Sequence, residues 1–426
     1  MTMQHRRTTL GILVGGGPAP GINSVIGAAT IRAALEGVDV VGIRNGFEHL
    51  MRGDLDHVRQ LSIDDVSRIH FRGGSFLGIS RANPTKDPAL LDEVARALER
   101  LGITQLITIG GDDTAFSAMR LEERVRGRLQ VVHVPKTIDN DLDLPPYIDT
   151  FGFQTARHRG VELVQSLMVD AETTGRWYFV IAMGRKAGHL ALGIGKGAGA
   201  TITLIPEEFQ GTQLKLRTLV DILTGAIVKR LSRERRDGVA VLAEGLGLLL
   251  DPRELGDLEH VERDEHGHIR LAEVDLGDVL KREVQKRLKE LGLKFTIVDH
   301  NVGYELRCTD PIPYDMEYCR DLGYCAAKFL LGGGNAAMVS MQGGRFVAVP
   351  FATMLDAETG RTRVRCVDIS SPRYAIARRF MIRIRRDDFD DPVILGALAA
   401  AAGLTVEEFR RRFEYVTETE PPPLQL

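Results

Sequence analysis

Short apolar segments that alternate with amphipathic ones across glycine-rich turns are the feature that most constrains how this chain can fold. Residues 10–14 are apolar, and residues 15–21 form a glycine-rich turn. Residues 22–36 then carry apolar side chains at helical spacing, and residues 38–43 are apolar again. This succession predicts a β-α-β unit with two parallel strands.

The same succession continues along the chain. Further short apolar segments lie at residues 106–109, 131–134, 178–183, 201–205 and 239–243. Strands that alternate with helices predict an α/β fold in which helices cover both faces of mostly parallel sheets. The length of 426 residues is enough for two or three domains.

The composition narrows the range of partners. Hydrophobic residues make up 44% of the chain and charged residues 27%, which is typical of a globular protein rather than a disordered one. The formal net charge of -3 does not favour a polyanionic partner, so we expect no nucleic-acid binding. No run of about 18 apolar residues is present, so we expect no membrane span.

The cysteines and the first residues of the chain indicate the cellular compartment in which the protein is expected. None of the four cysteines forms a C-x-x-C pair, so neither a zinc ribbon nor a redox motif is present. Few cysteines in a long chain are typical of a reducing environment. The apolar run near the first residue is too short for a secretory signal, so we expect a cytoplasmic protein.

The first glycine-rich loop, GGGPAPGIN at residues 15–23, matches neither of two common nucleotide-binding motifs. A dinucleotide fingerprint would need glycine in place of Pro20, and a Walker A loop would need Lys-Ser or Lys-Thr in place of Ile22-Asn23. A glycine turn before a helix still presents backbone N–H groups to an anion such as phosphate. Alternatively, the loop is only a tight turn that needs positive φ.

The second loop, GGDDT at residues 110–114, places Asp112 and Asp113 at the carboxyl end of a strand, the edge where ligands bind in open α/β sheets. Adjacent carboxylates repel each other unless a cation is bound, and a divalent metal carrying phosphate would be such a cation. The alternative is that one aspartate caps the following helix.

The third loop, PKTIDND at residues 135–141, also follows a predicted strand. Its lysine, Lys136, can neutralise phosphate, and an aspartate can take a proton from a hydroxyl group. A preference of Asn and Asp for turns would explain Asn140 but not the whole string.

Two arginine-containing segments remain open to interpretation. Arg185 follows the apolar segment 178–183, so it can reach a ligand at the carboxyl edge or form an ordinary surface ion pair. The dense arginines of residues 361–386 favour a solvated surface over a phosphate or partner patch. From residue 388 the sequence predicts a short helical piece and a frayed tail.

Together these segments resemble the phosphofructokinase family. They are, in order, GGGPAPGIN, FRGGSFLGISR (residues 71–81), ITIGGDDT, VPKTIDND, FGFQTA (residues 151–156), IAMGRKAG, VLAEG and GYELRCTDPIPYD. Each is weak alone, but they occur in the family's order and spacing over most of the chain.

The resemblance implies Mg²⁺-dependent phosphoryl transfer to the 1-hydroxyl of fructose 6-phosphate. By the family's pattern Asp139 is the general base, Asp112 binds the metal, and Lys136 and Arg185 assist the reaction. The pattern's substrate-binding positions are Thr137, Ile138, Asp139, Arg176, Met183, Gly184, Arg185, Glu244, Tyr304 and Arg307. Its donor-binding positions are Gly16, Arg81, Asp113 and Thr114.

Two positions indicate the phosphoryl donor. ATP-using relatives commonly read GGDG and PGTIDND, where this chain has Asp113 and Lys136. A carboxylate roughly 4 Å from the α-phosphate of ATP, at an effective dielectric of about 20, would repel it by about 4 kcal/mol. Lys136 offers a cation to the departing phosphate. The pair resembles the pyrophosphate-dependent branch, which implies reversible transfer from pyrophosphate to give fructose 1,6-bisphosphate and phosphate.

The resemblance also implies two Rossmann-like lobes with the active site in the cleft between them. We assign residues 1–150 and about 306–355 to a lobe for pyrophosphate and Mg²⁺. We assign residues 151–305 and about 356–426 to a lobe for the sugar phosphate. Arg176 matches an arginine that the family lends to the neighbouring subunit, so a homodimer or homotetramer is expected.

The chain departs from the family's pattern at three positions. Pro18 replaces a common aspartate, and Tyr304 stands for a histidine. Val298 stands where the family usually has an arginine that contacts the 6-phosphate from a neighbouring subunit, and Lys294 or His300 could substitute for it.

Other functions remain as alternatives. The first is an ATP-dependent sugar-phosphate kinase of the same fold. A catalytically silent phosphate-binding regulatory subunit is less favoured, because Asp139, Asp112 and Arg185 are all retained. A dehydrogenase is disfavoured by the failed dinucleotide fingerprint.

Overall fold

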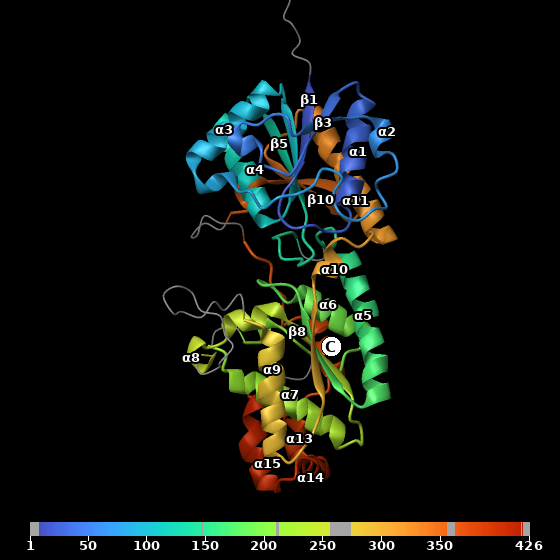
Figure 1. Ribbon diagram of the computed structural model, residues 1–426, viewed down its shortest axis with the longest axis vertical. Helices are drawn as coiled ribbons and strands as arrows, with labels where there is room; N and C mark the ends of the chain where they lie inside the picture. Colours follow the sequence, from blue (N-terminus) through green and yellow to red (C-terminus); the bar gives the residue numbers. More distant parts are fainter. Residues whose placement is uncertain are drawn as a thin grey trace, which may run out of the picture. The chain divides into compact units, whose positions relative to one another are not determined.

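The computed structural model describes residues 8–145, 148–209, 213–255, 274–355, 363–418 and 420. The chain divides into two compact units (Figure 1). Unit 1 comprises Met1–Ala156 and Tyr304–Arg365, and unit 2 comprises Arg157–Gly303 and Cys366–Leu426. The chain thus leaves unit 1, returns to it and ends in unit 2. The boundaries predicted from the sequence lie at residue 150 and at about 306 and 355.

Unit 1 is built on a seven-stranded sheet in the order β11-β10-β5-β4-β1-β2-β3. Its strands are β1 (Thr9–Val14), β2 (Asp39–Ile43), β3 (Val58–Leu61), β4 (Gln105–Gly110), β5 (Gln130–Pro135), β10 (Ala337–Gln342) and β11 (Arg345–Pro350). Neighbours pair in parallel except for the antiparallel edge strands β3 and β11. The predicted parallel sheet is confirmed. Neither antiparallel edge strand was predicted: β3 has two exposed polar residues, whereas β11 is apolar after Arg345 but only partly buried.

Helices cover both faces of this sheet, as predicted. In Figure 1, α1 and α11 lie on one side of it and α3 and α4 on the other, and each pair packs into its own apolar cluster. The helices are α1 (Ile22–Ala34), α2 (Ile63–Val66), α3 (Pro88–Arg100), α4 (Asp112–Val125), α10 (Tyr304–Arg307) and α11 (Pro313–Leu331). Short 3-10 helices span Leu50–Arg52, Pro84–Lys86 and Phe351–Thr353.

The strand order of unit 1 reverses between β1 and β4. The chain places β2 and β3 on one side of β1, then crosses to add β4 and β5 on the other side. In open parallel sheets, ligands bind in the crevice outside the carboxyl ends of the strands at such a reversal. The loops after β1 and β4 lie at this point.

Unit 2 is built on a parallel four-stranded sheet in the order β7-β8-β6-β9, with β6 (Trp177–Ala182), β7 (Ile202–Leu204), β8 (Gly238–Ala243) and β9 (Ile297–Val302). Its helices are α5 (Phe153–Thr174, which begins in unit 1), α6 (His189–Ala198), α7 (Leu216–Leu231), α8 (Pro252–Leu255), α9 (Leu276–Glu290), α12 (Pro372–Phe380), α13 (Asp387–Asp390), α14 (Pro392–Ala401) and α15 (Val406–Phe413). Short 3-10 helices span Pro206–Phe209, Glu244–Leu249 and Glu414–Thr417. Residues of α7, α9, α14 and α15 form one core with the sheet.

The C-terminal segment contributes to this core, contrary to the expectation of one short helical piece and a frayed tail. Phe409 and Phe413 of α15 are fully buried, with ring centroids 4.9 Å apart. Of the expected tail, residues 417–426, the structure describes Thr417, Glu418 and Glu420, and Thr417 is buried. Apart from its two phenylalanines α15 is mostly charged, which hides its buried face in the sequence.

The expectation of a solvated surface for residues 361–386 is also wrong for several arginines. Arg378 and Arg383 are 7% and 4% exposed. Both donate to the same carboxylate oxygen of Glu208, at 2.8 and 2.7 Å. A buried guanidinium needs such a partner because its desolvation is costly.

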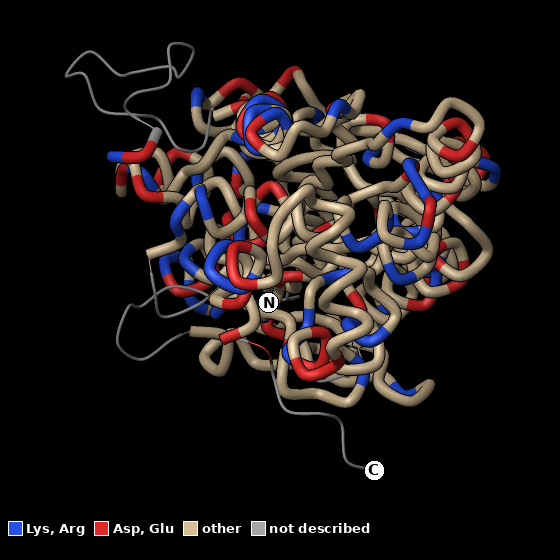
Figure 2. Tube along the Cα trace, turned by 90° about the horizontal axis from the view of Figure 1, so that it is seen from below, with Lys and Arg blue, Asp and Glu red and all other residues tan. Residues whose placement is uncertain are grey.

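The surface charges of the described residues are of mixed sign. Figure 2 shows Lys and Arg interleaved with Asp and Glu along the trace. Within the described residues, no single helix is long and apolar enough to cross a membrane; only α14 with residues 406–417, a pair bent by 86°, passes that test of length and composition.

We predict that Phe409→Ala destabilises unit 2, because it leaves a cavity where a phenyl ring is fully enclosed. Loss of a buried phenylalanine typically costs about 3–5 kcal/mol. Thermal unfolding should show a clearly lower Tm, whereas the exposed control Arg411→Ala should change stability by about 0.5 kcal/mol at most. An unchanged Tm in Phe409→Ala would mean that α15 is not part of the folded core.

Candidate active site

Three loops of unit 1 follow neighbouring strands and therefore begin side by side. The loop after β1 begins at Gly15, the loop after β4 at Gly111 and the loop after β5 at Lys136. The Gly15 N–H donates to the Ile109 carbonyl at 2.9 Å, and the Lys136 N–H donates to the Gly110 carbonyl at 2.8 Å. The loops GGGPAPGIN, GGDDT and PKTIDND thus meet at one edge of the sheet.

Thr114 explains why two of these loops need glycine. Its side chain is buried between them. A Cβ atom on Gly15 would lie 2.5 Å from Thr114 Oγ1, and one on Gly110 would lie 2.3 Å from Thr114 Cβ. Any larger residue at either position would push α4 away from the strand ends.

Gly16 lies among hydrogen-bond donors. Its φ of 82° is one that residues with a Cβ rarely adopt. A Cβ there would lie 3.7 Å from Lys136 Nζ and 3.9 Å from both the Gly111 nitrogen and Thr114 Oγ1. An ammonium, a backbone amide and a hydroxyl around one glycine suit an anion. The tight-turn interpretation and the anion-site interpretation therefore describe the same loop.

Lys136 is buried at this edge, with 4% of its surface exposed. Its ammonium donates to the Gly17 carbonyl. Burial lowers the pKa of Lys136 to about 8, although the nearby carboxylates of Asp139 and Asp141 act to raise it. A lysine so close to neutrality responds strongly to a bound anion, which would stabilise its charged form.

Two further cations face Lys136. The charges of Arg307 and Arg81 both act to lower its pKa, and the guanidinium carbon of Arg307 lies 3.8 Å from where a Cβ on Gly17 would be. Unit 1 therefore brings the predicted donor-binding residues Gly16, Arg81 and Thr114 together with Lys136, predicted to assist the reaction, and Arg307, predicted to bind the sugar phosphate. Such a cluster of positive charge is suited to a polyphosphate.

The predicted general base, Asp139, lies in a loop with a defined internal structure. Its N–H donates to Thr137 Oγ1 at 3.1 Å, and the Thr137 hydroxyl donates to Asp141 Oδ1 at 3.2 Å. Ile138 is buried beneath the loop. Asn140 adopts a left-handed φ of 58°, so the turn interpretation of that residue is correct.

Arg365 supports this loop through several hydrogen bonds, and its role was not predicted from the sequence. Its guanidinium donates to the Asn140 carbonyl at 3.1 Å, to the Asn140 side-chain oxygen, and to the Ile148 carbonyl at 2.6 Å. Its own N–H donates to the Asp141 carbonyl at 2.9 Å. The sequence grouped Arg365 with solvated arginines, because its partners lie more than 200 residues earlier in the chain.

Asp112 and Asp113 lie in the first turn of α4, and the N-cap residue is Gly111. The alternative that one aspartate caps the helix is therefore wrong. Asp113 is exposed and Asp112 is partly buried at the carboxyl end of β4. Carboxylate oxygens are preferred ligands of Mg²⁺, so Asp112 has the chemistry and the place that a phosphate-bound Mg²⁺ requires.

Hydrogen bonds join the first motif to the segment that carries Arg81. The Asn23 amide donates to the Arg72 carbonyl at 3.0 Å and accepts from the Phe76 N–H at 2.7 Å. The Gly16 N–H donates to the Ser80 carbonyl at 2.8 Å. These contacts fix the residue that precedes Arg81 directly beside the Gly16 loop.

A buried aspartate joins two later motifs. Asp315 of GYELRCTDPIPYD accepts from the N–H of Gly152 at 3.0 Å and from the N–H and hydroxyl of Thr155 at 2.7 and 2.6 Å. Burial raises the pKa of this carboxyl, although the three hydrogen bonds act to lower it. Asp315 thereby anchors the start of α5.

In unit 2, the predicted sugar-phosphate residues gather at the carboxyl ends of β6 and β8. Glu244 accepts from the Gly184 N–H at 3.3 Å and pairs with the Arg185 guanidinium at 3.1 Å. Met183 comes directly after β6 and packs against Gly303 at the end of β9. The Arg185 side chain is 60% exposed, so this ion pair is weak and leaves the guanidinium accessible to a ligand.

Other predicted residues lie apart from these two clusters. Arg176 precedes β6, at the opposite end of the strand from Arg185, and lies 3.7 Å from Asp170. Tyr304 is 79% exposed and stacks with Arg307 of its own helix. Lys294 and His300 are exposed, before and within edge strand β9.

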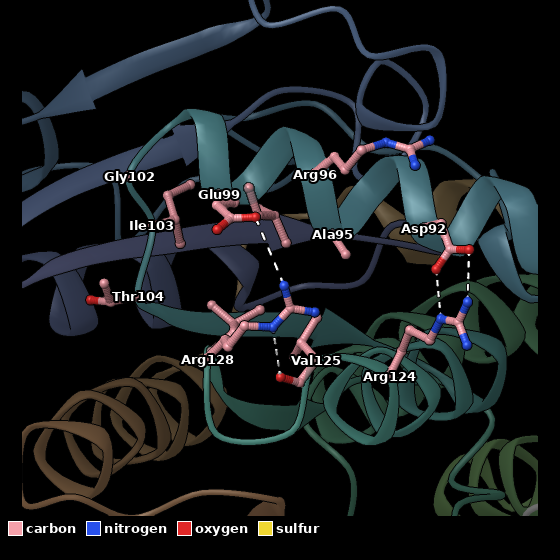
Figure 3. A pocket seen from close by; sticks show the side chains of 12 residues that line it. Asp92, Ala95, Arg96, Glu99, Gly102, Ile103, Thr104, Arg124, Val125 and Arg128 are labelled. Atoms are coloured by element: carbon pink, nitrogen blue, oxygen red, sulfur yellow. Dashed lines mark hydrogen bonds and ion pairs between the residues drawn. The ribbon is translucent and has the colours of Figure 1, made fainter.

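The pocket in Figure 3 is a different feature. It has a volume of about 140 Å³, and it is lined by α3, α4 and the residues that precede β4 and β5, at the opposite end of the sheet from the glycine loops. Its charged residues are already paired, Arg124 with Asp92 at 2.6 Å and Arg128 with Glu99 at 3.9 Å. It brings none of the predicted site residues together.

Comparisons with known proteins agree with this arrangement. Residues 9–330 match the family model described as phosphofructokinase. A pyrophosphate–fructose 6-phosphate 1-phosphotransferase of Thermotoga maritima is 53% identical, over 96% of this chain and 99% of the relative. One of Naegleria fowleri is 47% identical, over 96% of each. A crystal structure of a pyrophosphate-dependent phosphofructokinase from Marinobacter aquaeolei has a TM-score of 0.65 at 16% identity, over 98% of this chain and 94% of that one.

We predict that Arg365→Ala lowers turnover by about 10- to 100-fold, because a small displacement of a reacting group costs about this much. Since Arg365 acts through the Asp139 loop, added guanidinium ion should restore part of the turnover. The KM for the acceptor should change little, and the exposed control Arg363→Lys should behave like the wild type. A parallel loss of Tm and activity without rescue would contradict a positioning role.

Proposed function

The chain belongs to the phosphofructokinase family, and from this premise we propose that it transfers a phosphoryl group reversibly between pyrophosphate and the 1-hydroxyl of fructose 6-phosphate. The products of the forward reaction are fructose 1,6-bisphosphate and phosphate. The observation that carries the proposal is the buried Lys136 ammonium beside Gly16, in a chain with Asp113 next to the predicted metal ligand. Two enzymes named for this reaction, 53% and 47% identical to this chain over 96% of its length, support the proposal.

The proposed reaction is an in-line displacement. The carboxylate of Asp139 takes the proton of the sugar hydroxyl, whose oxygen attacks the terminal phosphorus of pyrophosphate. The bridging P–O bond breaks and phosphate leaves with the bond's electron pair. Lys136, Arg81 and Arg307 neutralise the charge that develops on the leaving phosphate.

Mg²⁺ is the metal that we propose for the site. Asp112 would hold it, and the bound ion would supply charge neutralisation for pyrophosphate. Arg185 and Glu244 would bind and orient the sugar phosphate.

The choice of donor follows from Asp113 and Lys136. A carboxylate at position 113 repels an α-phosphate and fills the space that a nucleoside would need. The buried ammonium of Lys136 supplies positive charge to the leaving phosphate of the shorter donor. Pyrophosphate is short enough to contact the Lys136 ammonium without approaching the Asp113 carboxylate.

We also propose a cytoplasmic homo-oligomer in which Arg176 acts on a neighbouring subunit. Arg176 is separated from Arg185 by the full length of β6, six residues that rise about 3.3 Å each. An arginine at the far end of the strand cannot reach the sugar-phosphate cluster of its own unit 2. A second copy of the chain could supply it.

We predict that the wild type uses pyrophosphate far better than ATP, and that Asp113→Gly gains measurable ATP use. Removing the carboxylate lifts both the repulsion and the steric block. Lys136→Gly should lower turnover with pyrophosphate without any gain with ATP, and so serves as the matched control. The measurement is kcat/KM for both donors in all three proteins. Comparable values for ATP and pyrophosphate in the wild type would refute the donor assignment.

We predict an alkaline decline of kcat/KM for pyrophosphate near pH 8. The pKa of Lys136 in the free enzyme is lowered to about 8, so its charge is present below that pH and lost as pH rises through it. In Lys136→Arg the guanidinium stays protonated, so the decline should move to higher pH. An identical decline in both proteins would assign it to another group.

We predict that Asp139→Asn lowers kcat by about 100-fold or more, the scale of a lost general base. Mixing Asp139→Asn with Arg176→Ala under conditions of subunit exchange should restore part of the activity, because some sites then receive both intact residues. A fully active monomer in sedimentation experiments would refute the shared site.

A further inference from the structure

Two histidines and an aspartate of unit 1 converge outside the active edge. His49, Asp54 and His57 lie in the connection between β2 and β3, and their possible ligand atoms lie within 4.8 Å of one another. His57 Nε2 lies 3.2 Å and His49 Nδ1 lies 3.7 Å from the same oxygen, Asp54 Oδ2. No step of the proposed phosphoryl transfer uses these residues.

The spacing of these atoms suits a small cation. Zinc binds imidazole nitrogen and carboxylate oxygen at about 2.0–2.2 Å, which places neighbouring ligands of a tetrahedral site about 3.3–3.5 Å apart. The separations of 3.2 and 3.7 Å bracket that value. The two imidazole rings are stacked, with centroids 3.5 Å apart and planes inclined by 14°. Because imidazole binds a metal in the plane of its ring, one of the two rings has to rotate for both to bind the same ion.

The surrounding loop holds the three side chains in place. Phe47 and Leu50 are buried and anchor the connection to the core of unit 1. The Asp54 N–H donates to the His49 carbonyl at 3.1 Å. The Asp56 N–H donates to Asp54 Oδ1 at 3.0 Å, which leaves Oδ2 directed at the histidines. The backbone of the connection is therefore held in place, and side-chain rotations alone would bring the three groups around an ion.

His49 also has the outer partner that metal-binding histidines usually have. Its second ring nitrogen, Nε2, lies 3.3 Å from the side-chain amide of Asn45. The atom that faces Nε2 is the amide nitrogen, Nδ2. Turning the amide over would place its oxygen there, so that Nε2–H donates to Asn45 and Nδ1 can ligate an ion. Such partners fix the ring orientation and its tautomer.

From these observations we propose that His49, Asp54 and His57 form a binding site for a divalent transition metal, with Zn²⁺ the best fit. Two imidazoles and one carboxylate select such ions over Mg²⁺, which prefers oxygen ligands in octahedral geometry. The side chains of His49, Asp54 and His57 are 14%, 37% and 43% exposed, so an ion can enter and a water molecule can complete its coordination.

A bound metal would tie the turn at residues 50–52 to the start of β3. The same connection begins at Asn45, whose N–H donates to the Leu77 carbonyl at 3.0 Å, in the segment that leads to Arg81. The site is thus expected to stabilise the loop structure next to the donor-binding edge. The proposed metal site does not depend on which phosphoryl donor the protein uses.

Equilibrium dialysis against low-micromolar Zn²⁺ tests the proposal. Excess Mg²⁺ is present to occupy Asp112, and the exposed thiols of Cys308 and Cys366 are alkylated beforehand because they could bind zinc themselves. We expect one Zn²⁺ per chain in the wild type. His57→Ala should weaken binding by about 100-fold or more, since losing even an outer-shell partner costs about 10- to 100-fold.

The matched control is His158→Ala, which removes an exposed histidine of α5 paired only with Glu162 among the described contacts. It should bind Zn²⁺ like the wild type. Zinc should raise the Tm of the wild type and of His158→Ala but not that of His57→Ala. No zinc uptake by the wild type, or equal uptake by His57→Ala, would overturn the proposal, whatever the phosphoryl-transfer assays show.

Discussion

The parallel pairing of β1, β4 and β5 is the constraint on which the donor-side chemistry of this protein depends. Because the three strands are neighbours, their carboxyl ends deliver Gly16, Thr114 and Lys136 to one edge. The reversal of strand order between β1 and β4 keeps that edge open. A lysine buried there is costly on its own, and its position is tolerated because it donates to the Gly17 carbonyl and lies near the carboxylates of Asp139 and Asp141.

Many residues of the family motifs position the site rather than line it. Asn23 connects the first glycine loop to the segment before Arg81, Asp315 anchors the start of α5, and Arg365 supports the Asp139 loop. Each of these contacts joins segments that are far apart in the sequence. The motifs therefore occur together in one chain because they pack against one another in the fold.

The sequence predicts the central strands well and the periphery poorly. Strands buried on both faces appear as continuous apolar runs, as β4 and β6 do. The edge strand β3 and the helix α15 have no such run, because one side of each meets solvent. The positions of the site loops at the carboxyl ends of β1, β4 and β5 were also predictable, since each loop follows an apolar run.

The arginines near the C-terminus were not predictable for a different reason. Arg378 and Arg383 are buried against Glu208, which lies 170 and 175 residues earlier, and no local pattern distinguishes them from surface arginines. Arg365 shows the same problem at the site itself. These charges are buried because they form ion pairs and hydrogen bonds with residues far away in the sequence. Such contacts are visible only in the tertiary structure.

The central claim is that the buried Lys136 ammonium is part of the pyrophosphate site. Calorimetric titration with methylene bisphosphonate, a pyrophosphate analogue without a scissile P–O–P bond, tests it most directly. In the presence of Mg²⁺, the wild type should bind the analogue at least about tenfold more tightly than Lys136→Met, because a hydrogen bond to a charged group contributes about 1.5–3 kcal/mol. Equal affinity in the two folded proteins would contradict the account and place the donor away from Gly16.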